Sequence, residues 1–235
     1  MTMKNDKKDM EKTNRLASIG LLAATVAHEL RNPLAVIQTA TFNIKAKRVN
    51  KDIDKNIANI EKKLYESNQI INNLLTYSNI KSPVRKDMNL CDTLEEAIFF
   101  AGKRFQGANV SIQKEFHCSE INITGDPLQL KEVFANILNN AFQAMNPRKK
   151  GIIKVKANVA EGKEVVIEII DNGKGMDEDD LGKAFEPFFS KKSRGVGLGL
   201  AISAEIINLH DGSIDIKSRK GSGTELRIIL PFNQA

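Results

Sequence analysis

The sequence predicts an α+β protein in which a long two-helix hairpin precedes a sandwich of helices and mixed strands. Apolar residues recur in alternating steps of three and four over the first third of the chain, which is typical of packed helices. After Ser82-Pro83 the pattern changes to short alternating runs, typical of strands, with helical runs between them. A chain of 235 residues has room for one or two such domains.

The first predicted helix has an apolar seam of nine residues: Leu16, Ile19, Ala23, Val26, Leu30, Pro33, Ile37, Ala40 and Ile44. With Ala23 at heptad position a, His28 falls at position f, which faces solvent. A buried structural role for His28 is therefore disfavoured, and an ordinary surface histidine is the remaining alternative. Pro33 removes a backbone hydrogen bond to the carbonyl of Glu29, which costs about 3 kcal/mol or bends the helix.

A second helical pattern follows a polar turn at Lys47–Lys51. Its seam again alternates steps of four and three: Ile53, Ile57, Ile60, Leu64, Ser67, Ile71 and Leu74. Two helices joined by a short turn form an antiparallel hairpin, which cannot cover both sides of its own seam. We therefore expect two copies of the chain to form a four-helix bundle with His28 on its outer face.

The second part of the chain alternates between strands and helices. The predicted helices are 92–105, 127–145 and 197–209, and the predicted strands are 109–116, 121–124, 152–159, 164–170, 213–218 and 224–230. Helices on one side of such a sheet give an α+β sandwich. The expected domains are a lead-in over residues 1–14, the hairpin over 15–82 and the sandwich over 83–235.

Composition disfavours several functions. The net charge of +6 suits an acidic partner, but the lysines are scattered, only 6% of residues are aromatic, and no tryptophan is present, so nucleic acid is not expected. Cys91 and Cys118 are too few and too far apart for a disulfide framework or a zinc site, and both are expected to be reduced. No membrane segment or signal peptide is recognisable, so we expect a cytoplasmic chain or the cytosolic part of a longer membrane protein.

Two short motifs of the second domain offer oxygen acceptors. Asn136 and Asn140 share a face of one predicted helix, where two amide oxygens suit Mg²⁺ whose other ligands are phosphate and water. Local capping is the alternative for this pair. Asp171 ends a predicted strand before Gly173 and Gly175, so it offers an acceptor for an amino group beside backbone that a flat ring can approach. A simple turn after the strand is the alternative here.

Two further motifs surround a long loop. Phe185–Lys192 places aromatic residues and then cations on a polar segment, consistent with a lid anchor or a small satellite core. Gly195, Gly197 and Gly199 precede a helical pattern, where free N–H groups and the helix dipole favour phosphate. The glycine spacing is neither that of a dinucleotide motif nor that of a Walker loop. A loop of about twenty residues in a compact domain suggests a nucleotide lid.

Together these motifs resemble the cytoplasmic core of a sensor histidine kinase of a two-component system. The resemblance covers roughly residues 15–235 and shows the family's blocks in order: His28–Leu34, Asn136–Asn140, Asp171–Gly175, the phenylalanine-rich segment, Gly195–Gly199 and Gly221–Thr224. It implies a Bergerat-type ATP-binding fold, ATP and Mg²⁺ as cofactors, a homodimer, and the receiver domain of a response regulator as partner. The chain would then be the cytosolic part of a sensor that can be membrane-bound.

The resemblance also implies roles for the matching residues. His28 would attack the γ-phosphate, Glu29 would orient its imidazole and accept its proton, and Asn32 would orient water for hydrolysis of the regulator's phosphoaspartate. The implied nucleotide-binding residues are Asn136, Asn140, Asp171, Gly173, Gly175, Lys191, Gly195, Gly197, Leu198, Gly199 and Thr224, with Mg²⁺ at Asn140 and Asn136. Ser190 stands where many relatives have an arginine, so Lys191, ahead of Lys192 and Arg194, is expected to reach the γ-phosphate.

Two other functions use the same fold. An ATP-gated clamp or ATPase would hydrolyse ATP to drive closure, but such clamps lack the helical hairpin that carries His28. A scaffold would hold ATP or a regulator without turnover. For the kinase, contacts with the regulator are expected from exposed hairpin residues such as Thr39, Asn43 and Asn73.

Overall fold

The computed structural model describes residues 23–46, 53–116, 120–146, 149–160, 164–191 and 197–232. The chain divides into two compact units, of which the first contains Met1–Ile80 with Pro187–Leu198, and the second contains Lys81–Glu186 with Gly199–Ala235. The predicted lead-in over residues 1–14, the turn at Lys47–Lys51 and the thiol of Cys118 lie outside the described residues.

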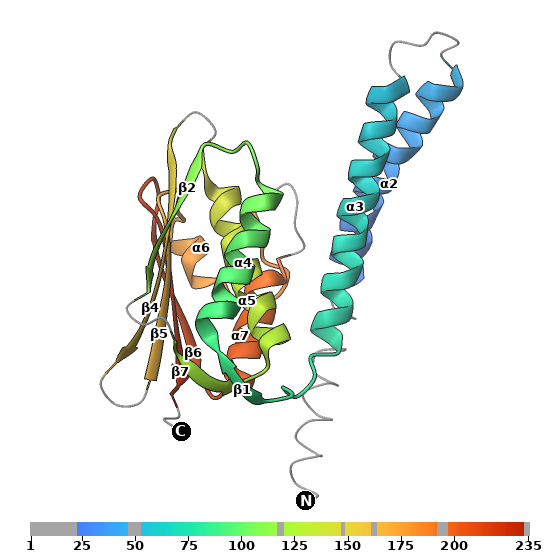
Figure 1. Cartoon of the computed structure of the whole chain (residues 1–235). Helices are drawn as coiled ribbons and strands as arrows, with labels where there is room; N and C mark the ends of the chain where they lie inside the picture. Colours follow the sequence, from blue (N-terminus) through green and yellow to red (C-terminus); the bar gives the residue numbers. More distant parts are fainter. Residues whose placement is uncertain are drawn as a thin grey trace, which may run out of the picture. The chain divides into compact units, whose positions relative to one another are not determined.

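The first unit contains the predicted helical hairpin (Figure 1). Helix α2 spans Ala23–Ala46 and continues through Pro33, and helix α3 spans Ile53–Ser78 and packs against it. Ala40, Ile70 and Tyr77 are buried in the hairpin. Within the described residues, no helix is both long and apolar enough to cross a membrane.

The seam predicted for α3 divides between two faces of the helix. One face is buried in the hairpin and includes Ser67. The other face is exposed, and its large apolar side chains are Ile57, Leu64, Ile71 and Leu75. The regular spacing predicts the helix correctly, and the exposed face is the part of the seam that a single hairpin leaves uncovered.

The second unit is a sandwich with a five-stranded sheet (Figure 1). Its strands are β2 (Val110–Phe116), β4 (Gly151–Ala160), β5 (Glu164–Asp171), β6 (Ser213–Arg219) and β7 (Gly223–Pro231). The strand order is β2-β4-β5-β7-β6, with β2 and β4 parallel and the other neighbours antiparallel. The mixed sheet confirms the predicted fold class.

Three helices cover one face of this sheet (Figure 1): α4 (Leu90–Arg104), α5 (Pro127–Ala144) and α7 (Gly199–Leu209). Fully buried apolar side chains from helices and strands, including Leu94, Ile137 and Ile167, form the core. Asp126 and Pro127 explain where α5 begins, because the Asp126 side chain accepts hydrogen bonds from the N–H groups of Leu128 and Gln129, and proline is favoured at the first helical position.

Two short elements were not predicted. Strand β1 (Lys86–Asn89) pairs antiparallel with β3 (Asn122–Gly125), and helix α6 (Glu178–Gly182) is a single short turn. Strand β1 has only four residues and only Met88 is buried, so it shows no alternating pattern. Helix α6 has no buried residue to mark a helical face.

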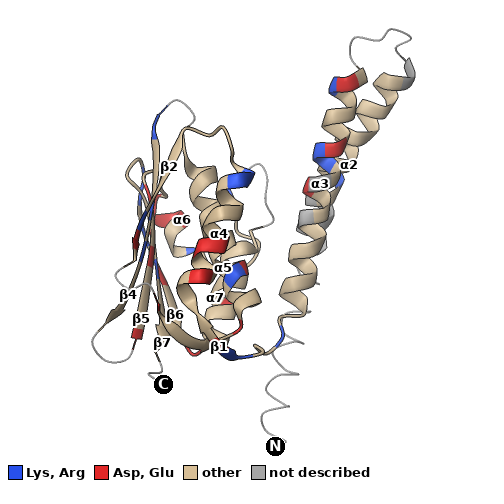
Figure 2. Cartoon of the chain, in the orientation of Figure 1, with Lys and Arg blue, Asp and Glu red and all other residues tan. Residues whose placement is uncertain are grey.

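The strands of this sheet carry charged residues of both signs (Figure 2). Lys156, Glu168, Arg227 and Asp215 are neighbours in register across four strands. The Lys156 Nζ lies 3.6 Å from Glu168 Oε2. Across these four strands the lysine and the arginine therefore alternate with carboxylates.

Candidate active site

Polar side chains from three neighbouring strands meet at one end of the sheet. Asp171 of β5 is in register with Thr224 of β7, which is in register with Ser218 of β6. Asp171 is only 8% exposed, and its Oδ1 accepts a hydrogen bond from the N–H of Gly173 at 2.7 Å. Ser218 Oγ lies 3.0 Å from Thr224 Oγ1. The register therefore brings Asp171 and Thr224 together, although they are 53 residues apart in the sequence.

Three glycines bring the backbone close around Asp171. Gly175 and Gly223 have φ values of 61° and 96°, which L side chains rarely adopt. A Cβ on Gly175 would collide with the carbonyl oxygen of Arg219, and one on Gly223 would collide with that of Asp171. A Cβ on Gly173 would lie 2.7 Å from Asp171 Oδ1. The glycine requirement predicted at Gly173 and Gly175 thus has a structural cause in the backbone packing, whatever the ligand.

The two predicted asparagines lie one turn apart on α5, and both are half-buried. Gly199, the first residue of α7, lies beside Asn136, because a Cβ on Gly199 would be 3.8 Å from the amide carbon Cγ of Asn136. The N-terminal N–H groups of a helix lack partners within the helix and carry the positive end of its dipole. An amide and a helix N-terminus therefore adjoin, an arrangement suited to a phosphate group.

The donor set fits Mg²⁺ bound together with phosphate. Within the described residues, no three His, Cys, Asp or Glu side chains are grouped so that they could hold a metal ion. Asn136 and Asn140 offer neutral amide oxygens, which are ligand types that Mg²⁺ accepts along with phosphate oxygens and water.

Two residues of this region were missed in the sequence. Ser218 accepts a hydrogen bond from the N–H of Met176 at 2.9 Å and donates one to the carbonyl of Gly223 at 2.8 Å, and its position depends on strand register. Glu132 precedes Asn136 by one helical turn, and burial raises the pKa of its carboxyl group above the usual value. A signal for Glu132 was available in the four-residue spacing to Asn136.

Among the predicted lid residues that are described, Lys191, Gly197 and Leu198 lie in the first unit, whereas Phe185 and Glu186 lie in the second. The N–H of Phe188 donates to the carbonyl of Gly197 at 3.0 Å, and both residues have positive φ values, 67° and 71°. The Phe188 ring meets the Tyr77 ring edge-on with centroids 6.2 Å apart. Leu198 is fully buried and Lys191 is exposed, whereas Gly195 lies outside the described residues. Phe188 thus has an aromatic partner, Tyr77, within its own unit.

The backbone of His28 and Glu29 belongs to α2, but their side chains lie outside what the structure describes. Ala35 and Phe42 occupy the same heptad position as His28, and both are exposed, Phe42 to 69%. Asn32, four residues after His28, is also exposed. The heptad position that His28 shares is therefore exposed at Ala35 and Phe42, and the outward orientation of His28 itself stays a prediction.

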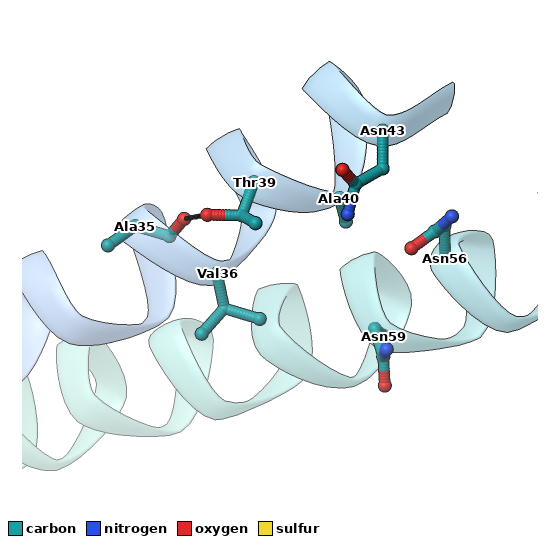
Figure 3. A pocket seen from close by; sticks show the side chains of 7 residues that line it. All are labelled: Ala35, Val36, Thr39, Ala40, Asn43, Asn56 and Asn59. Carbon is teal, nitrogen blue, oxygen red and sulfur yellow. Dashed lines mark hydrogen bonds between the residues drawn. The ribbon is translucent and has the colours of Figure 1, made fainter. Parts of the chain in front are cut away.

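A groove runs between α2 and α3 (Figure 3) and is lined by Ala35, Val36, Thr39, Ala40, Asn43, Asn56 and Asn59. None of these side chains is charged. The Thr39 hydroxyl donates to the carbonyl of Ala35 at 2.9 Å, so its hydrogen bond is made within α2. The other polar groups in the lining are the amides of the three asparagines. Asn43 and Thr39, two of the predicted contact residues, line this groove, while Asn73 lies elsewhere on α3.

Two family models match the chain one after the other. The "His Kinase A (phospho-acceptor) domain" matches residues 18–83, and the "Histidine kinase-, DNA gyrase B-, and HSP90-like ATPase" matches residues 125–234. A phospho-acceptor hairpin followed by this ATPase domain defines the class, and the chain belongs to the histidine kinase family.

Among individual relatives, the chain is 34% identical to the signal transduction histidine-protein kinase AtoS of Escherichia coli, over 98% of its own length and 38% of AtoS. It is 32% identical to sporulation kinase E of Bacillus subtilis, over 96% of its own length and 30% of that kinase. It is also 30% identical to the sensor histidine kinase ZraS of Salmonella typhimurium, over 94% of its own length and 48% of ZraS. The chain thus spans half or less of the length of these relatives.

Solved structures show the same fold. The histidine kinase ThkA in complex with the response regulator protein TrrA matches with a TM-score of 0.84 and 23% identity, over 99% of this chain and 67% of that one. The Acinetobacter baumannii histidine kinase AdeS matches with a TM-score of 0.71 and 19% identity, over 88% of this chain and 98% of that one.

Proposed function

We propose that this chain is the core of a protein-histidine kinase that binds ATP in its second unit and transfers the γ-phosphoryl group to His28. The observation that carries the proposal is the cluster of Asp171, Thr224 and Ser218 at the end of the sheet, in the same unit as an amide that adjoins a helix N-terminus. The first feature suits the amino group of adenine and the second suits phosphates.

We assign the remaining nucleotide contacts to the residues that match the family's motifs. Asp171 accepts from the adenine amino group, and Thr224 contacts the base through water. Asn136 and Asn140 hold Mg²⁺, which neutralises phosphate charge when it is bound. Gly173, Gly175 and Gly199 shape the pocket, while Lys191, Gly195, Gly197 and Leu198 serve as the lid, with Lys191 directed to the γ-phosphate.

The chemical step forms a bond between an imidazole nitrogen of His28 and the γ-phosphorus. The bond from that phosphorus to the oxygen bridging the β- and γ-phosphates breaks, and ADP leaves. Glu29, the next residue on α2, accepts the proton of the imidazole ring, so that a neutral nitrogen attacks. The heptad position of His28, shared with exposed Ala35 and Phe42, supports access of the ATP-binding unit to the imidazole.

We also propose that the chain works as a homodimer. The exposed apolar side chains of Ile57, Leu64 and Ile71 recur every seven residues along α3. Such a stripe is the seam that a second hairpin covers in a four-helix bundle.

ATP is abundant in the cytosol, and we place the kinase activity there.

The phosphoryl group then passes to an aspartate on the receiver domain of a response regulator. The uncharged groove of α2 and α3, with Thr39 and Asn43 in its lining, supports a regulator surface that offers hydrogen bonds and apolar contacts. Asn32, exposed four residues beyond His28, would orient the water that hydrolyses the regulator's phosphoaspartate. The chain would therefore also act as a phosphatase.

The test is incubation with γ-labelled ATP and Mg²⁺, beside His28→Ala and the matched α2 surface variant Gln38→Ala. Label that is acid-labile and alkali-stable, present in Gln38→Ala and absent from His28→Ala, is expected. ATP hydrolysis without label on the chain would instead indicate an ATP-driven clamp. Binding of ATP with neither hydrolysis nor label would indicate a scaffold.

A further inference from the structure

We propose that Arg85, Asp126 and His210 are positioning residues for phosphoryl transfer. Their hydrogen bonds connect the segment that follows the hairpin with α5 and α7, the two helices that carry the candidate phosphate-contacting groups. This proposal rests on the proposed function. The segment consists of residues 81–85, called here the joining segment, and it belongs to the second unit.

The joining segment is bound at both ends and in the middle. The Gln129 Nε2 group donates to the carbonyl of Lys81 at 3.0 Å, and the N–H of Val84 donates to Asp126 Oδ2 at 2.9 Å. Arg85 Nη2 donates to the carbonyl of Leu209 at 2.8 Å and to Asp211 Oδ2 at 2.6 Å. The segment therefore contacts the start of α5 and the end of α7 at the same time.

Asp126 connects these contacts. Its Oδ1 accepts from the N–H groups of Leu128 and Gln129, which caps α5, while its Oδ2 holds Val84 of the joining segment. Its backbone N–H donates to Nε2 of His210 at 3.0 Å. One residue thus serves as helix cap, as acceptor for the joining segment and as donor to the end of α7.

The hydrogen bonds of His210 define its protonation state. A backbone N–H can only donate, so Nε2 accepts and the ring proton is on Nδ1, which donates to the carbonyl of Ile206 at 2.8 Å. His210 is only 4% exposed. Gly125 packs beside the ring, since a Cβ there would be in van der Waals contact with His210 Cδ2 at 3.4 Å. The imidazole is therefore a fixed spacer between α7 and the start of α5.

The cluster of Arg85, Asp126 and His210 lies at one end of α5 and one end of α7, away from the candidate phosphate-contacting groups. Asn136 follows Asp126 by ten residues, which corresponds to roughly 15 Å of helix, and α7 extends over about 16 Å from Gly199 to the residue before His210. Each helix is held by the cluster at one end and carries a candidate phosphate-contacting group further along. A displacement of the joining segment would therefore change the spacing of those groups, while Asp171 at the adenine end would be unaffected.

The test compares autophosphorylation kinetics of full chains carrying Arg85→Ala, Asp126→Asn or the conservative Arg85→Lys. Asparagine keeps an oxygen for the α5 cap but places an NH₂ group, which cannot accept, opposite the Val84 N–H. The matched control is Lys86→Ala, which changes the next exposed cation and leaves the cluster intact. Amide hydrogen exchange at Val84 reports whether the joining segment is released.

The expected result is an approximately tenfold lower rate constant at saturating ATP for Arg85→Ala and Asp126→Asn, with the half-saturating ATP concentration within twofold of wild type. Arg85→Lys should recover part of the rate, and Asp126→Asn should exchange the Val84 amide faster. Unchanged rates, unchanged Val84 exchange, or a parallel loss of ATP affinity and thermal stability would overturn the positioning role. A wild-type chain that forms no phosphohistidine would contradict the proposed function itself.

Discussion

Asp171 and His210 are two buried polar residues of the second unit that differ in how far the sequence predicts them. Each keeps a hydrogen bond to backbone, Asp171 from Gly173 and His210 to Ile206, so neither is buried without a partner. Asp171 could be selected from the sequence because it ends an apolar strand and precedes two glycines. His210 could not, because its partner Asp126 is 84 residues away and the sequence gives no sign of that contact.

Replacement of Asp171 by asparagine should weaken ATP binding with little loss of stability. The asparagine oxygen can still accept the Gly173 N–H, but the negative charge offered to the adenine amino group is lost. A hydrogen bond to a charged group contributes about 1.5–3 kcal/mol, so affinity should fall roughly tenfold to a hundredfold. Titration with a fluorescent ATP analogue measures this, with Asp215→Asn on the open sheet face as control. Equal affinities of the two variants would contradict the role of Asp171.

His210 should make the stability of the second unit depend on pH. Burial lowers the pKa of His210 below 6.5, as does the nearby Arg85, whereas the Ile206 carbonyl, Asp126 and Asp211 act to raise it. Because the folded pKa is depressed, the unfolded chain binds more protons just below pH 6.5, so stability rises with pH through this window and is lost as pH falls.

Urea unfolding between pH 5 and 8 measures this dependence. The wild-type chain should lose more stability than His210→Gln as the pH falls below 6.5. Parallel pH profiles of the two chains would show that His210 does not titrate differently in the folded and unfolded states.

At the scale of elements, the sequence was most informative where a periodicity is sustained. Apolar residues recur at helical spacing from Pro127 to Ala144, so the helix predicted over 127–145 matches α5 within one residue. Strand β1 and helix α6 were missed because each is too short to display a period. The register that aligns Asp171, Thr224 and Ser218 also could not be predicted, since strand order depends on the whole sheet.

Two glycine-to-alanine substitutions should have opposite effects. Gly223 has a positive φ and abuts the carbonyl of Asp171, so Gly223→Ala should destabilise the chain by about 2 kcal/mol or more and weaken ATP binding. Gly102 lies within α4 with open space around it, so Gly102→Ala should stabilise the chain by about 0.5–1 kcal/mol. Denaturant unfolding of both variants checks the signs. A neutral Gly223→Ala would contradict the close backbone packing at the adenine end.

At the scale of the whole molecule, the order of motifs predicted both units, and the family matches confirm the kinase class. The helical hairpin and the sandwich could be predicted because their periodicities differ, 3.5 residues in one and 2 residues in the strands of the other. The joining segment could not be assigned in this way. Its four hydrogen bonds connect residues far apart in the sequence, and Ser82-Pro83 reads only as a break in the helix.

Dimerisation is tested by two neighbouring substitutions on α3. Ile71 is 44% exposed and continues the stripe of Ile57 and Leu64, whereas Asn72 is exposed one position further around the helix. Ile71→Asp would place a charge in the seam of the bundle and should weaken the dimer roughly a hundredfold. Asn72→Asp adds the same charge outside the seam and should leave the dimer intact. Sedimentation equilibrium distinguishes these outcomes, and equal behaviour of both variants would show that this stripe is not the interface.

The central claim is transfer of the γ-phosphoryl group of ATP to His28. The most direct measurement is localisation of phosphate by mass spectrometry of peptides, prepared at alkaline pH after incubation with ATP and Mg²⁺. The account predicts one phosphate per modified chain, on the peptide that contains His28 and on its imidazole, and roughly tenfold to a hundredfold less in Asp171→Asn chains at limiting ATP. Phosphate on a serine, threonine or another histidine, or ADP formation with every peptide unmodified, would contradict it.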